Sequence, residues 1–176
     1  MKETRNMSVR DLARAAVIAA IYAILTIALA PISSGLIQCR VAEAMCVLPY
    51  FTFSAVPGLF IGCVLANLII GAPVYDVVFG SLATLLAAYA TYALRNKAPK
   101  YLAPLPSVVI NAGIVGALLV YVYGVHVSYW AAAGYVAAGQ AVACFVIGLP
   151  LMSLLEHFGD KLRITDNAEK DSRKEE

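Results

Sequence analysis

The chain has 176 residues, of which 61% are hydrophobic and 14% are charged, and its formal net charge is +2. Together with a mean hydropathy of +0.79, this composition indicates an integral membrane protein and excludes an ordinary soluble domain. The net charge is too small to indicate binding to nucleic acid, and the length suits one compact bundle.

Six apolar segments follow one another along the chain and predict an all-α membrane fold of six helices, because a backbone inside lipid must satisfy its own hydrogen bonds. The first segment is longer than a signal-peptide core and lacks an A-x-A cleavage site, so we interpret it as a retained helix. The helices are expected at about 12–30, 41–53, 57–71, 76–94, 107–123 and 128–155.

The end of the chain differs from these segments. Residues 160–176 carry charges of both signs without apolar periodicity, which is typical of a solvated, partly disordered segment. We therefore expect two parts: a single six-helix transmembrane domain at 1–159 and a charged cytoplasmic tail at 160–176.

Basic clusters at the ends of the apolar segments predict the orientation. Such clusters remain on the cytoplasmic side, so both termini and the loop after the fourth segment are expected there. Each membrane crossing changes the side on which the chain lies, so an even number of helices must separate two cytoplasmic clusters. The region between residues 41 and 71 must therefore contain two helices, not one. The clusters are Lys2, Arg5, Arg10 and Arg14, then Arg95, Lys97 and Lys100, and finally Lys161 and Arg163.

The second segment is short for a membrane helix. The thirteen residues from 41 to 53 give a helix of only about 20 Å, whereas the hydrocarbon core is about 30 Å thick. We therefore expect the preceding loop at 31–40, which carries Gln38 and Arg40, to dip into the protein, where non-helical backbone is tolerated.

The stretch QCRVAEAMCVLPYF at residues 38–51 places two charges inside an apolar run. Between the first two basic clusters the only charged residues are Arg40, Glu43 and Asp76, and the predicted orientation puts all three on the outer side. Ionisable residues inside a membrane mark a solute or ion path by default. The alternative is an ion pair between Arg40 and Glu43, three residues apart, that locks the loop. We favour a solute site because Asp76 adds a carboxylate without an obvious basic partner.

Amides and aromatic rings in and beside the predicted helices extend this candidate site. The amides can contact a solute or join helices, and the rings can stack on a solute or belong to the interfacial aromatic belt. The sequence leaves both readings open. The candidate solute-binding residues are Gln38, Arg40, Glu43, Asn67, Asp76, Asn111, Tyr121, Tyr129, Trp130 and Gln140.

The first helix also carries small residues four positions apart, which allow another membrane helix to approach closely. They predict a docking surface for a partner in one of two registers, and the alternative is packing inside the bundle. The registers are Ala15, Ala19 and Ala23, or Ala16 and Ala20.

Motifs of enzymes and nucleotide sites are missing from the sequence, including HExxH, GxSxG and a Gly-rich phosphate loop with Lys. The four cysteines have no CxxC spacing, so we predict buried thiols, with no metal site and no cofactor. We predict no catalytic residues, and any ATP-driven work would need partner subunits.

Four stretches then carry a family resemblance: QCRVAEAMCVLPYF, PGLFIGCVLANLIIG, DVVFGSLATLLAAYATYALR and PLPSVVINAGIVG. Together they closely resemble the QueT family of queuosine-precursor transporters, which are substrate-binding (S) components of energy-coupling factor transporters. The resemblance extends from Arg10 to about Leu155.

The resemblance implies a multi-pass protein of the prokaryotic plasma membrane with the S-component fold. Its solute site would lie near the outer face, closed by the loop between the first two helices. The partners implied are a transmembrane coupling subunit, which contacts the alanine motif of the first helix, and two ATPase subunits. The solute implied is a queuosine precursor or queuine, a deazaguanine-type base.

A guanine-like edge offers N–H donors next to a carbonyl acceptor. We therefore expect Glu43 or Asp76 to accept from the solute and Arg40, Asn67 or Gln38 to donate to it. The rival hypothesis is a self-sufficient, ion-coupled secondary transporter of a small polar solute. Such transporters often contain inverted repeats, and the halves of this chain show no convincing repeat.

Overall fold

A computed structural model describes residues 7–30 and 40–158 of the chain. Within these ranges every regular element is helical. Gln38 and the tail predicted at 160–176 lie outside the described residues.

Four helical stretches are long and apolar enough to cross a membrane: Val9–Ala28, Asp76–Leu94, Lys100–Val122 and Tyr129–Phe158. Each occupies the place of a predicted apolar segment. The first is α1 (Val9–Ala28), the second joins η2 (Asp76–Gly80) to α4 (Ser81–Leu94), and the third joins η3 (Lys100–Leu102), α5 (Leu105–Ala117) and η4 (Leu118–Val122). The fourth consists of α6 (Tyr129–Ala141), η5 (Val142–Ile147) and α7 (Gly148–Phe158).

Two shorter helical segments lie between α1 and η2. The positions of the basic clusters predict two helices in this region. They are Val41–Phe51, formed by η1 (Val41–Val47) and α2 (Leu48–Phe51), and α3 (Ala55–Ile69). Local signals explain several helix ends. Ser8 and Asp11 form a capping box at the start of α1, and glycines with positive φ, Gly71 at 70° and Gly124 at 65°, follow α3 and η4.

The prediction of one regular α-helix at 41–53 is wrong in its form. Residues 41–47 are a 3₁₀ helix, and a single α-helical turn with Pro49 in its first positions follows it. A 3₁₀ helix rises about 2.0 Å per residue, so this short segment extends further than an α-helix of equal length. Residues 42–49 are all buried, because the segment packs against α1, α4, η5 and α7 in the interior of the bundle.

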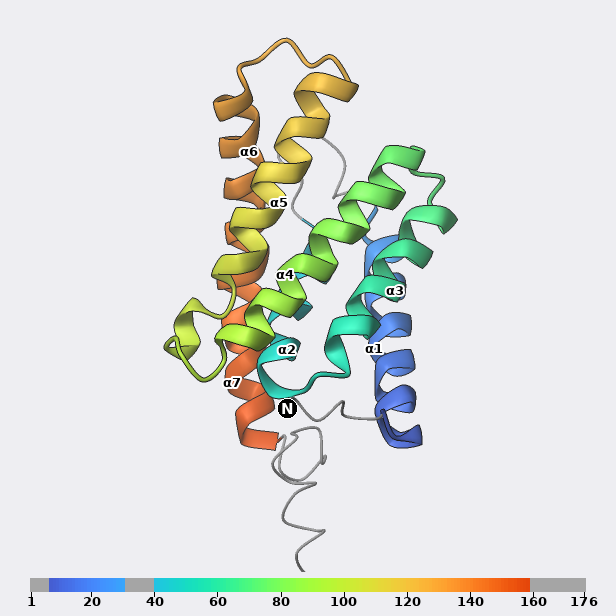
Figure 1. Cartoon of the computed structure of the whole chain (residues 1–176), viewed down its shortest axis with the longest axis vertical. Helices are drawn as coiled ribbons and strands as arrows, with labels where there is room; N and C mark the ends of the chain where they lie inside the picture. The colour runs from blue at the N-terminus through green and yellow to red at the C-terminus, as the bar shows by residue number, and fades with distance from the viewer. Residues whose placement is uncertain (1–6, 31–39, 159–176) are drawn as a thin grey trace, which may run out of the picture.

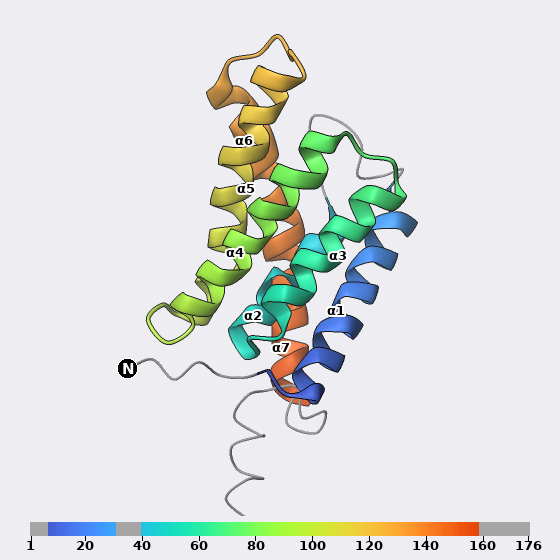
Figure 2. The ribbon, with the colours of Figure 1, turned by 45° about the vertical axis from the view of Figure 1, so that its right-hand side comes forward.

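Helices α1 and α3 pack side by side with their backbones in close contact (Figure 2). A β-carbon on Gly58 would lie 2.8 Å from the Ala15 carbonyl oxygen, and one on Gly62 would lie 2.8 Å from that of Ala19. The small residues at this contact therefore serve packing inside the bundle.

This packing corrects the first docking register. Ala15, Ala19 and Ala23 expose only 3%, 4% and 7% of their surface, because they face the inside of the bundle, and they are unavailable to a partner. Ala16 and Ala20 lie outside this buried face of α1 and are exposed.

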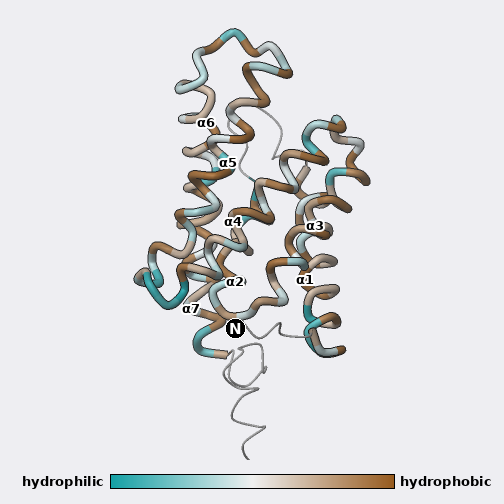
Figure 3. Tube along the Cα trace, in the orientation of Figure 1, coloured by the Kyte–Doolittle hydropathy of each residue, from teal (hydrophilic) through white to brown (hydrophobic). Residues whose placement is uncertain are grey.

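Large apolar side chains cover much of the exposed surface of the helices, including Val17, Ile24, Leu86, Val109 and Val146. Figure 3 shows hydrophobic colours along the helices and hydrophilic colours at the α4–α5 connection and the end of α7. An exterior of this kind fits the acyl chains of a bilayer.

The start of α1, the α4–α5 connection and the end of α7 lie at one end of the bundle (Figure 1). The α3–α4 and α5–α6 connections lie at the opposite end (Figure 1). The basic residues of the described chain therefore gather mainly at one end, as the positive-inside argument requires.

Candidate functional site

A cavity between η1, η2, α5 and α6 brings together polar residues that are far apart in the sequence. About 340 Å³ of space lies between its walls, including open solvent at the mouth, and its interior has only about 10 Å³, enough for about one water molecule. Its lining consists of Arg40, Glu43, Asp76, Gly80, Asn111, Val115, Val136 and Gln140. Half of the ten candidate solute-binding residues are in this lining, including all three isolated charges.

The backbone at the start of the fourth span suits this role. Residues Asp76–Gly80 form a π-helical turn, a local widening of the helix that is frequent at functional sites. Asp76 and Gly80, at its two ends, both line the cavity. Because Gly80 has no side chain, the backbone itself forms that part of the wall.

Asn67 lies behind Arg40 and is fully buried. The Arg40 Nη2 donates to Asn67 Oδ1 at 3.4 Å, and Asn67 Nδ2 donates to the backbone carbonyl of Asp76 at 3.3 Å. One amide thus connects the guanidinium of η1 with the first residue of η2. Asn67 contributes to the site by holding two of its lining residues rather than by lining the cavity.

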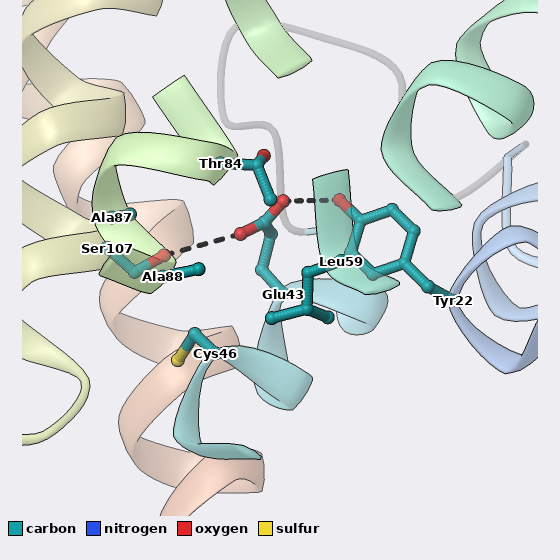
Figure 4. Close-up of a pocket in the computed structure, with 8 residues that line it drawn as sticks. All are labelled: Tyr22, Glu43, Cys46, Leu59, Thr84, Ala87, Ala88 and Ser107. Carbon is teal, nitrogen blue, oxygen red and sulfur yellow. Dashed lines mark hydrogen bonds between the residues drawn. The ribbon is translucent and has the colours of Figure 1, made fainter. Parts of the chain in front are cut away.

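Glu43 is a buried carboxylate with one hydroxyl donor on each oxygen (Figure 4). The Tyr22 hydroxyl on α1 donates to Oε1 at 2.5 Å, and the Ser107 hydroxyl on α5 donates to Oε2 at 3.3 Å. The alternative of an ion pair between Arg40 and Glu43 is not realised within the described residues. Each charge is instead held by a neutral side chain from another helix.

Two amides complete the polar lining. Asn111 Nδ2 donates to the backbone carbonyl of Ser107 at 3.0 Å and to its hydroxyl at 3.3 Å. Gln140 Oε1 accepts from the Cys144 thiol at 3.5 Å. These hydrogen bonds run within single helices, so they orient the amides toward the cavity instead of joining helices.

Tyr123 lies beside Asp76, one of the lining residues. Partial burial and the neighbouring Asp76 carboxylate together raise the pKa of Tyr123 to about 12, while the Arg40 guanidinium opposes the shift. The phenol is therefore neutral at physiological pH and can donate a hydrogen bond. The Asp76 carboxylate therefore has the Tyr123 phenol as a hydrogen-bonding neighbour, and within the described chain it forms no ion pair.

The three predicted aromatic residues lie outside the cavity lining. Tyr121 and Trp130 expose 76% and 81% of their surface. Tyr129 stacks on Tyr121 and meets Trp130 edge-on, and its hydroxyl donates to the Gly113 carbonyl at 3.4 Å. None of these three rings lines the cavity. They form an aromatic group at the α5–α6 connection, as the interfacial-belt alternative expects.

A second cavity lies on the other side of Glu43, and it contains residues that the sequence interpretation missed (Figure 4). Its lining is Tyr22, Glu43, Cys46, Leu59, Thr84, Ala87, Ala88 and Ser107. Ser107 could have been found, because it lies four residues before Asn111 and therefore shares its helix face. Tyr22 had a weaker signal, a single aromatic residue in the apolar run of the first helix.

Comparison with known families gives one match. The family model described as QueT transporter matches residues 12–157, which confirms the resemblance carried by the four sequence stretches. No curated protein and no solved structure matches the chain.

Proposed function

The chain belongs to the QueT transporter family, and we propose that it is the solute-binding membrane subunit of an ATP-driven importer of the energy-coupling factor type. Its solute would be a queuosine precursor or queuine, a deazaguanine-type base. Hydrolysis of ATP would reside in two partner subunits, and this chain would perform no catalysis of its own.

The polar cavity in an otherwise apolar bundle is the observation that carries this proposal. Arg40, Asp76 and Gln140 lie in its wall, and groups of this kind inside a membrane protein are costly unless they serve a polar ligand or one another. A few convergent polar groups between apolar surfaces are typical of small-molecule sites.

Asp76 is the carboxylate best suited to accept hydrogen bonds from the solute. Glu43 already accepts from two hydroxyls. Asp76 lines the cavity with one neighbouring phenol, Tyr123, and forms no ion pair in the described chain. A carboxylate accepts two adjacent N–H donors of a guanine-like edge, and Arg40 can donate to the neighbouring carbonyl. Val115 and Val136 offer apolar surface to the faces of the ring.

The cavity must open before such a base can enter. Its interior of about 10 Å³ suits a water molecule and not a bicyclic ring. We propose that the helices around the cavity move apart on binding, as is common for sites that close over their ligand.

For the membrane arrangement, we propose six helical segments in one domain at 1–159, with both termini and the tail at 160–176 on the cytoplasmic side of a prokaryotic plasma membrane. The gathering of basic residues at one end of the bundle supports this orientation. The short segments Val41–Phe51 and Ala55–Ile69 would enter the bilayer as a pair.

The coupling subunit would approach α1 on the face that carries Ala16 and Ala20. This face is exposed, and small side chains there would admit a partner helix at close range. The opposite face of α1 is occupied by α3.

The solute assignment is tested by thermal unfolding of the purified full chain with queuine, its biosynthetic precursors, guanine and an unrelated vitamin. A ligand that binds the folded state raises the midpoint temperature in a concentration-dependent way, and we expect this with queuine or one of its precursors alone. Absence of any shift with these deazaguanines would falsify the solute assignment.

The energising partners require a separate test. We expect coupling and ATPase subunits to co-purify with the tagged chain from native membranes. Uptake by vesicles that contain this chain alone, driven by a proton or sodium gradient, would support the rival secondary transporter.

A further inference from the structure

Glu43 occupies a junction between the two cavities and three helical elements. It is carried by η1, it lines both cavities, and its oxygens bind hydroxyls from α1 and α5. A buried carboxylate needs such donors, because an uncompensated charge in an apolar interior is strongly unfavourable.

The two hydroxyls hold the carboxylate in a defined orientation. They approach different oxygens from opposite sides (Figure 4), which fixes both the position and the plane of the group. Hydrogen bonds from hydroxyls to a charged oxygen are shorter and stronger than neutral ones, and the Tyr22 contact of 2.5 Å is at the short end of that range.

Neighbouring residues direct each hydroxyl. Asn111 donates to the Ser107 hydroxyl oxygen at 3.3 Å, so the Ser107 hydrogen is left to point at Glu43. The Tyr22 ring is buried in a core cluster with Met45 and Leu59, which fixes the direction of its hydroxyl. Both donors are therefore preorganised.

We propose that Tyr22 and Ser107 are positioning residues for solute binding. They hold the Glu43 carboxylate as part of the wall of the solute cavity, and through Tyr22 the arrangement of that wall depends on the position of α1. This inference rests on the proposed function, because it assigns the two hydroxyls to the binding of the proposed solute.

The test is a double-mutant cycle on the affinity of the purified full chain for queuine. Tyr22→Phe and Ser107→Ala each remove one donor, and each is combined with Glu43→Gln, which removes the charge that the donor holds. Tyr89→Phe, on the exposed face of α4, is the matched control, and Ser107→Thr restores a hydroxyl at position 107.

We expect Tyr22→Phe and Ser107→Ala to weaken binding about tenfold in the wild-type background, since each loses a hydrogen bond to a charged group. In the Glu43→Gln background the same changes should weaken binding less than about threefold, because their effect passes through the carboxylate. Ser107→Thr should recover most of the affinity, and Tyr89→Phe should bind as the wild type does.

Equal losses in the two backgrounds overturn the inference, since general loosening of the bundle acts regardless of the charge at position 43. Wild-type affinity in both donor variants overturns it as well and leaves the proposed function standing. If Tyr22→Phe does not fold, the Ser107→Ala cycle decides by the same criterion. A wild-type chain that binds no queuine refutes the proposed solute first, and the inference falls with it.

Discussion

The carbonyl oxygen of Ala19 on α1 lies 2.8 Å from the point that a β-carbon of Gly62 on α3 would occupy. The same distance separates the Ala15 carbonyl oxygen from a β-carbon at Gly58, one turn earlier. The two helices therefore meet backbone to backbone, and the contact leaves no room for a methyl group.

Gly62→Ala should destabilise the protein. The added methyl group meets main-chain atoms that cannot turn aside, and overpacking of this kind typically costs about 1–3 kcal/mol. Thermal unfolding in detergent measures the change. Gly134→Ala in α6 is the control, because a β-carbon there has no neighbour within 4 Å, and alanine favours a helix over glycine. Equal midpoints for the two variants would show that α1 and α3 are not packed this closely.

Tryptophan substitutions on α1 should separate internal packing from docking. Ala19→Trp places a large ring in the buried contact with α3, so folding and solute binding should fail together. Ala16→Trp and Ala20→Trp project from the exposed face and should leave the affinity for solute nearly unchanged while ATP-driven uptake is lost. Full uptake by both exposed-face variants would contradict docking on this surface.

Asp76→Asn should weaken solute binding at least about tenfold, because an amide replaces the charged acceptor that faces the cavity. The measurement is the dissociation constant for queuine by calorimetry. Tyr121→Ala and Trp130→Ala, at the exposed aromatic group, are the controls and should leave affinity unchanged. If affinity for queuine fell strongly in the two aromatic variants and not in Asp76→Asn, the aromatic rings would belong to the binding site and Asp76 would not.

Lys100→Gln should leave the unfolding midpoint unchanged. The Lys100 ammonium lies 2.9 Å from a Glu156 oxygen, yet the two side chains expose 60% and 37% of their surface. Exposed ion pairs of this kind contribute little because water and salt screen them. Unfolding scans at low and high salt check this, and a drop of several degrees at both salt concentrations would show that the pair fixes the α4–α5 connection to α7.

The sequence predicts the helical segments well because their boundaries have local causes. Apolar runs, glycines and prolines mark the ends of α3 and the start of η2, and the parity of basic clusters requires the short pair before them. The convergence of Arg40, Glu43 and Asp76 also follows from sequence, because isolated charges in an apolar chain are costly unless they lie near one another or near a polar ligand.

Other features depend on tertiary packing and are not visible along the chain. Ala15 and Ala16 begin equally plausible alanine registers, and only the position of Gly58 and Gly62 on a neighbouring helix selects the buried one. The contacts of Glu43 with its donors are also hidden in the sequence, because Tyr22 and Ser107 approach it from helices that are distant along the chain. The aromatic rings at 121–130 resemble stacking residues in composition, but the end of the α5–α6 hairpin holds them away from the cavity.

The central position of the Val41–Phe51 segment has a consequence for how the chain is assembled during synthesis. At eleven residues and with a buried glutamate, this segment is a poor substrate for insertion by itself, since a charge in the bilayer centre costs several kcal/mol. Its Ser107 donor is synthesised 64 residues later. We expect nascent chains that end before residue 105 to leave this segment accessible to cysteine-reactive probes at position 46, and chains that include α5 to α7 to protect it. Early protection would show that the amino-terminal half assembles without the rest of the bundle.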